Sequence, residues 1–262
     1  IFDLRPYAAM NGTGGGLGKI DLGFGKLDVA YIQENKNPEG SSSIGNPNKE
    51  ALDLRIHGMA EGALDAWLAS ASISNGDLGP SYTGFALGLK YSSTIADGNN
   101  SVVLAYGSGA MQDLGMSMGY SGATEDVKKQ NRTRIVEDFS KEISPKVGIL
   151  ASAKYETSSD VVAAGKTTTE YALGVRPIYY FSDQIQWVFE GGTASYTNSN
   201  TNKTATVTRL TTGPQLSFKH SIWSRPVIRA FVTSSSWNED YKTTTLASDT
   251  AFKDKTSATQ IG

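Results

Sequence analysis

Charged residues stand at every second position of several segments, and their mixed signs indicate what this chain can bind. Interspersed acids and bases offer hydrogen-bond donors and acceptors together, which suits a neutral, hydroxyl-bearing solute better than a phosphate. A simpler interpretation stays open for each residue, namely that it only solvates one face of a strand. The residues that share this parity are Asp53, Arg55, His57, Lys154, Glu156, Arg176, Glu190, Arg209, Arg225 and Arg229.

The sequence contains few residues of the types that catalyse reactions. The chain has no cysteine and only two histidines, His57 and His220, so a thiolate site, a histidine-rich zinc site or a Ser-His-Asp centre is not expected. The glycine-rich tract 12–18 satisfies neither the dinucleotide-binding pattern nor a P-loop. We therefore expect no enzyme activity, no metal and no cofactor.

Composition narrows the class of protein further. The 262 residues carry a formal net charge of −2, with 19% charged and 39% hydrophobic residues, which argues against both a nucleic-acid binder and a disordered chain. The 28 glycines and the 10% aromatic content favour strands. The sequence has no run of roughly 18 apolar residues, but a transmembrane β-barrel does not need one, because only alternate residues face lipid.

Alternation of apolar and polar residues is the strongest local pattern, since successive side chains of a strand point to opposite faces. In one segment Leu52, Leu54 and Ile56 interleave with charged residues. The pattern predicts roughly 11 strands, separated by tight turns and by longer polar links at 35–49, 109–130, 158–167 and 198–203. The predicted strands are 17–34, 50–60, 63–73, 81–93, 101–108, 131–142, 146–157, 168–181, 184–197, 204–219 and 225–238.

Tight turns that alternate with long links are typical of an outer-membrane barrel, so the predicted fold class is all-β, an antiparallel transmembrane β-barrel. Aromatic residues near one turn, Tyr179, Phe181, Trp187 and Phe189, fit the girdle that such barrels place at the membrane interface. A soluble β-sandwich is the alternative, because its core could use the same residues.

Three stretches of the sequence resemble the maltoporin family of sugar-specific porins: 12–30 (GTGGGLGKIDLGFGKLDVA), 171–180 (YALGVRPIYY) and 221–231 (SIWSRPVIRAF). The third is the most specific. The resemblance implies a trimeric barrel of about 18 strands with a narrowed channel, in the outer membrane of a Gram-negative cell. Residues 1–262 are then expected to form a single β-barrel domain that is incomplete at both ends.

The same resemblance implies an aromatic slide flanked by an ionic track. Trp223 matches one slide aromatic, although a lone tryptophan also fits an interfacial or core anchor. A second slide position falls on Leu87 without a gap and on Phe85 with a slip of two residues. Trp67 is a further lumen candidate from parity alone. The expected substrate-binding residues are Trp223, Phe85, Arg225, Arg229, Arg176, Glu190, Asp53 and Arg55; the prolines after Arg176 and Arg225 offer a structural explanation for those two arginines.

The resulting hypothesis is a channel for facilitated diffusion of maltose, maltodextrins or related oligosaccharides. Its expected partners are the sugar solute, outer-membrane lipid and two further copies in a homotrimer, with no nucleic acid. The alternatives are a soluble or surface β-sandwich that binds carbohydrate or serves a structural role, and a general porin without selectivity.

Overall fold

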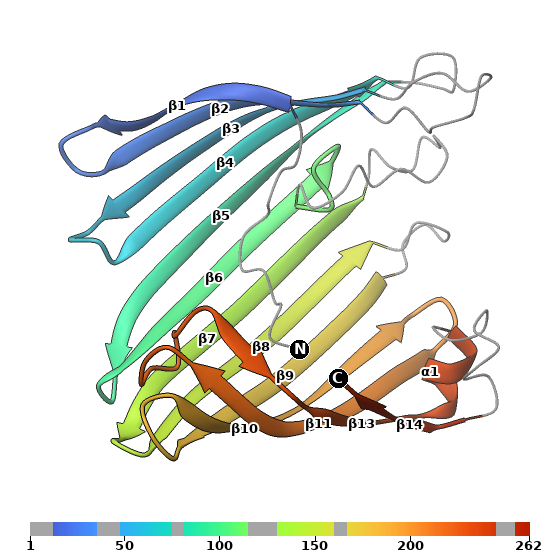
Figure 1. Ribbon diagram of the computed structural model, residues 1–262. Helices are drawn as coiled ribbons and strands as arrows, with labels where there is room; N and C mark the ends of the chain where they lie inside the picture. The colour runs from blue at the N-terminus through green and yellow to red at the C-terminus, as the bar shows by residue number, and fades with distance from the viewer. Residues whose placement is uncertain (1–12, 36–47, 75–80, 115–129, 160–166, 245–254) are drawn as a thin grey trace.

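One antiparallel sheet dominates the computed structural model, which describes residues 13–35, 48–74, 81–114, 130–159, 167–244 and 255–262. Its strands follow one another in chain order, and within the described residues the sheet is open, with β1 and β14 at its edges. The sheet curls into a trough (Figure 1). The elements are β1 (Thr13–Asp21), β2 (Lys26–Asn35), β3 (Asn48–Met59), β4 (Leu64–Ser74), β5 (Tyr82–Ile95), β6 (Gly98–Gly109), β7 (Asn131–Ser144), β8 (Val147–Ser159), β9 (Thr167–Tyr180), β10 (Ile185–Asn198), β11 (Lys203–Ser217), β12 (Val227–Arg229), β13 (Val232–Trp237), α1 (Glu239–Thr244) and β14 (Ser257–Ile261).

The predicted all-β antiparallel class is confirmed, while two predicted strands are wrong in detail. Segment 17–34 is not one strand but most of the hairpin β1–β2, which turns at Leu22–Gly25 with Gly23 at φ 82°. Segment 225–238 is split into β12 and β13, both of which pair with β11. The short helix α1 and the strand β14 were not expected.

Tight turns join the strands at one end of the sheet. At the β3–β4 turn, Ala60, Glu61 and Gly62 all have positive φ, and Ala96 and Asp97 do so at the β5–β6 turn. Two successive residues with positive φ give the turn a twist that matches the right-handed twist of the strands. The strand ends at the opposite end of the sheet are joined by the long links of the sequence.

The two faces of the sheet have opposite chemistry. The outer, convex face carries large apolar side chains that are exposed, such as Leu68, Leu104 and Leu210, whose exposed fractions are 50, 48 and 61%. The inner face, which lines the trough, carries buried polar residues such as Asp53, Arg134 and Glu156. Apolar outside and polar inside is the reverse of a soluble protein and is the arrangement of a transmembrane barrel.

No helix among the described residues has the length and apolar character needed to cross a membrane.

Candidate functional site

The segment between β11 and β12, residues 218–226, leaves the sheet and folds back across the inner face. Figure 1 shows it in orange over β7 and β8. The Ile222 backbone N–H donates a hydrogen bond to Oε1 of Glu142 on β7 at 2.9 Å, and the Tyr180 hydroxyl donates to Oε2 of the same carboxylate at 2.9 Å. We call residues 218–226 the inner segment. One carboxylate thus ties this segment to β7 and β9.

Apolar packing adds to these hydrogen bonds. The Ile222 side chain is buried in a cluster with Ile178, Tyr180 and Val188, and Leu150 packs against it. The neighbouring residue on β8 is Gly148, where an added Cβ would collide with Ile222 and with the Glu142 carboxylate. A side chain at position 148 would therefore displace the groups that attach the inner segment to the wall.

A hollow of about 600 Å³ lies beside the inner segment. Trp223 and Arg225 line it from the segment, and Arg176 lines it from β9. The Trp223 side chain is 58% exposed, so one face of its ring is open to solvent. The rest of the lining offers mostly polar groups, from Lys90, Ser92, Ser93, Asn99, Asn100, Ser101, Asp138, Phe139, Ser140, Leu150 and Ala151.

Strand parity does not account for the inner position of Arg225, nor for that of Trp223. They are not in a strand, because 218–226 pairs with no neighbouring strand; Ser221 and Ser224 close a local turn instead, through a backbone hydrogen bond of 3.0 Å. Their position on the inner side follows from the Glu142 and Ile222 contacts. Arg229, in β12, does follow the alternation and faces inward opposite Gln215.

Two of the predicted arginines near this hollow, Arg176 and Arg229, have side-chain partners. Arg176 Nε donates to Glu190 Oε2 at 2.8 Å, so the two predicted residues form an ion pair between β9 and β10. Arg229 donates to the Gln215 amide oxygen through Nε at 3.0 Å and through a terminal nitrogen at 2.5 Å. These pairs hold the two guanidinium groups in fixed directions.

Asp53 and Arg55 form a second group, on β3. Arg55 donates to both carboxylate oxygens of Asp53 at 2.9 Å, and its guanidinium carbon lies 6.0 Å from the ring centroid of Trp67. Trp67 is 4% exposed, and within the described residues its buried Nε1 has no hydrogen-bond partner. Trp67 is therefore packed in the wall, whereas Trp223 is open.

The remaining residues of the predicted parity also lie on the inner face. His57 Nε2 lies 3.2 Å from Asp28, Lys154 pairs with Glu170 at 2.7 Å, and Glu156 pairs with Arg132 and Arg134. Arg209 lines a different hollow, farther along β11.

Phe85 lies on the wrong face to join this group. Its neighbour Ala86 is fully buried on the inner face, while Phe85 is exposed on the outer face, where its ring lies 5.8 Å from that of Tyr106. The alternation of β5 enforces this, and Leu87, two residues on, also points outward. We leave Phe85 out of the proposed site.

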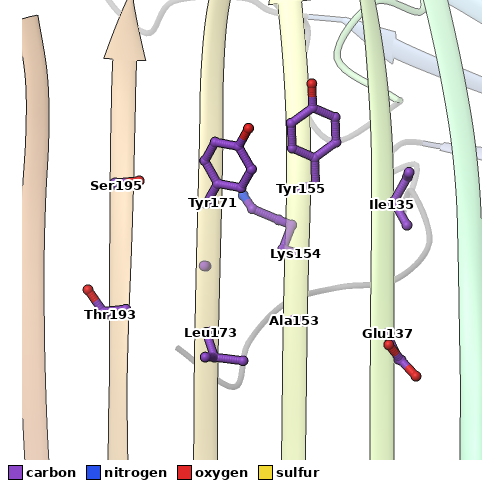
Figure 2. A pocket seen from close by; sticks show the side chains of 10 residues that line it. Ile135, Glu137, Ala153, Lys154, Tyr155, Tyr171, Leu173, Thr193 and Ser195 are labelled. Carbon is purple, nitrogen blue, oxygen red and sulfur yellow. The ribbon is translucent and has the colours of Figure 1, made fainter.

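A shallower hollow of about 360 Å³ opens on the outer face of β7 to β10 (Figure 2). Figure 2 shows the rings of Tyr155 and Tyr171 side by side, with centroids 5.0 Å apart, above Leu173 and Thr193. The adjacent Lys154 pairs with Glu170 on the inner side. Because exposed apolar side chains surround this hollow, it belongs to the outer face and not to the inner wall.

Several residues that shape the site had no signal in the sequence. Glu142 and Gln215 act through partners that are distant along the chain. The stretch Ala110–Leu114, expected to belong to a polar link, instead packs on the inner face: Met111 and Leu114 are buried beside Trp67, and Asp113 pairs with Lys49 at 3.6 Å.

The inner wall thus presents an open aromatic ring and oriented charged groups, while the outer wall presents apolar side chains, an arrangement that suits passage of a polar solute through a membrane. The comparison with known families agrees with this geometry. The family model described as LamB porin matches residues 1–262, the whole chain. The chain therefore belongs to the LamB porin family, a family of outer-membrane sugar channels rather than of enzymes.

Proposed function

We propose that this protein is a sugar-selective channel whose solute stacks on Trp223 and exchanges hydrogen bonds with the charged groups beside it. The single observation that carries the proposal is the position of Trp223. Trp223 is 58% exposed and lines a hollow of about 600 Å³ on the inner face, together with Arg176 and Arg225. A pyranose has C–H-rich faces that stack on an aromatic ring and a rim of hydroxyls that pair with charged groups.

The charged pairs favour a neutral oligosaccharide. Arg176 with Glu190, and Asp53 with Arg55, place acids and bases side by side, so the wall offers both donors and acceptors without a ring of one sign. Maltose, maltodextrins or related glycosides are the proposed solutes. The proposed assembly is a homotrimer in outer-membrane lipid, with the exposed apolar side chains of the outer face against lipid or a neighbouring copy.

The test replaces Trp223 in the full-length channel reconstituted in planar bilayers. Trp223→Ala is expected to weaken block of the ion current by maltohexaose by about 1 kcal/mol, the scale of an aromatic contact, and to leave ion conductance through the open channel nearly unchanged. Trp187→Ala is the matched control, because it removes the same side chain from the outer parity, where Trp187 Nε1 donates to Thr212 at 2.7 Å. Unchanged sugar block in Trp223→Ala, together with loss of a heat-stable trimer, would instead make Trp223 an assembly residue.

A further inference from the structure

A second hollow lies on the inner face, toward the end of the sheet that carries the long links. Its volume is about 660 Å³, and its lining comes mainly from β11, β13, β14 and the helix α1. Aromatic rings line it from Phe231, Trp237 and Tyr241, and charged groups from Glu190, Arg209 and Arg229. None of these three aromatic residues is among the expected substrate-binding residues.

The Trp237 ring is fixed before any ligand arrives, and it lies next to the Tyr241 ring. Trp237 and Tyr241 have centroids 6.3 Å apart at an angle of 41°. The Trp237 ring is held by its Nε1, which donates to the Lys255 carbonyl at 2.8 Å, and its backbone N–H donates to the Thr256 carbonyl at 2.8 Å. A ring whose orientation is already set loses little conformational entropy when a ligand stacks on it.

Asn238 attaches α1 to the sheet and so places Tyr241. Its Oδ1 accepts hydrogen bonds from the backbone N–H groups of Thr206, at 3.0 Å, and Tyr241, at 2.9 Å. Its amide nitrogen donates to the Thr204 carbonyl at 2.7 Å. One side chain therefore joins the first turn of α1 to β11, and the Tyr241 ring is kept at the rim of the hollow.

The polar groups of the hollow include one arginine, Arg209, that is available to bind a ligand. Among the described residues, the Arg209 side chain has no ion-pair or hydrogen-bond partner, and its guanidinium is exposed on the inner face. Thr211 and Thr233 form a hydroxyl pair 2.8 Å apart beside it, and Gln260 contributes an amide. Fixed rings with free donors and neutral acceptors are what a sugar face and its hydroxyl rim require.

We propose that this second hollow is a separate sugar-docking site, which stacks a pyranose on Trp237 and Tyr241 and binds its hydroxyls through Arg209. The proposal rests on the proposed channel function. Arg229 and Glu190 line the hollow on the side of the Arg176–Glu190 pair, so a sugar chain that leaves it meets the charged wall next to Trp223. Long links of such barrels lie on the extracellular side, so this site receives the solute first.

The experiment measures rates of current block by maltohexaose, added separately to each side of oriented full-length channels. In Trp237→Ala and in Tyr241→Ala, the rate of block from the long-link side is expected to fall about fivefold, and the rate from the short-turn side by less than twofold. Trp237→Phe keeps a ring and is expected to retain most of the rate. Unchanged ion conductance shows that each variant has folded.

The outcomes separate the two proposals. If wild type is blocked and both alanine variants are blocked at the wild-type rate from the long-link side, the second site is overturned while the channel function stands. An equal fall in rate from both sides overturns the assignment to the entrance. If maltohexaose does not block the wild-type channel from either side, the channel function fails, and this site fails with it.

Discussion

The carboxylate of Glu142 accepts a hydrogen bond from the backbone N–H of Ile222 at 2.9 Å, across 80 residues of sequence. This contact joins the wall of the trough to the inner segment, which presents Trp223. A backbone donor and a carboxylate form a charge-assisted hydrogen bond, which is stronger than one between neutral groups. The position of the proposed stacking residue thus depends on an acidic residue outside the hollow.

Replacing Glu142 should therefore change sugar binding without touching the sugar. Glu142→Ala leaves the Ile222 N–H and the Tyr180 hydroxyl without their acceptor, at a cost of about 1–3 kcal/mol for a buried unpaired group. We expect the inner segment to loosen, so that block by maltohexaose weakens and open-channel current fluctuates more. Glu142→Gln keeps one acceptor oxygen, so its sugar block and its current noise should lie between those of wild type and those of Glu142→Ala. Wild-type block and wild-type current noise in Glu142→Ala would contradict this role.

Gly148 offers a test of the same docking from the opposite wall. Gly148→Ala puts a methyl group where Ile222 and Glu142 already lie, and overpacking of this kind costs about 1–3 kcal/mol. We expect a lower melting temperature of the folded channel in detergent and weaker sugar block. Gly191→Ala is the control, because on the outer face an added Cβ meets only the flexible end of Leu210, at 3.3 Å. Equal melting temperatures for the two variants would refute the packing argument.

Local alternation predicted most of the strands, because the two-residue period of a strand can be recognised from a few adjacent residues. It failed at 17–34, where the turn at Leu22–Gly25 interrupts a segment that otherwise reads as one strand. It also failed at 218–219 and 225–226, which were predicted to extend the flanking strands but belong to the inner segment, where the backbone is held by Glu142 and by packing with Ile178. Contacts between distant parts of the chain leave no local period.

For the candidate site, too, local patterns predicted the faces of residues but not their contacts. Residues within regular strands, such as Arg176 and Glu190, have the face that parity predicts, but parity does not reveal that they form a pair. Phe85 was assigned by similarity with a slip of two residues, and such a slip keeps the face of a strand, so the position with the slip and the position without it, Leu87, both point outward. Trp237 shares the parity of Arg229 within the predicted strand 225–238, but it follows a run of serines and lies outside the stretches that carry the family resemblance.

The Arg176–Glu190 pair should set the ionic preference of the channel. Glu190→Gln removes a negative charge beside two arginines, Arg176 and Arg229, so the local potential becomes more positive and anions are favoured. The expected result is a shift of the zero-current potential toward that of chloride in a potassium chloride gradient. Asp183→Asn controls for the loss of one charge, since Asp183 lies at an exposed turn. A shift of the same size in both variants would show that position on the wall is irrelevant.

Arginine substitutions at two adjacent residues of β11, one on each face of the sheet, should differ in their effect on stability. Leu210 lies near the middle of this 15-residue strand and is 61% exposed on the outer face, while Thr211 points inward and lines the second hollow. Arginine facing lipid at mid-depth costs about 2–4 kcal/mol, whereas an arginine facing the lumen stays in water. Leu210→Arg is therefore expected to lower the free energy of unfolding in lipid vesicles by about 2–4 kcal/mol, measured by urea titration, and Thr211→Arg to lower it by less than about 1 kcal/mol. The two variants differ mainly in the face of the sheet that carries the new arginine, because both add the same side chain at nearly the same depth. Equal losses would mean that the outer face does not meet lipid at this position, and a larger loss for Thr211→Arg would reverse the assignment of the two faces.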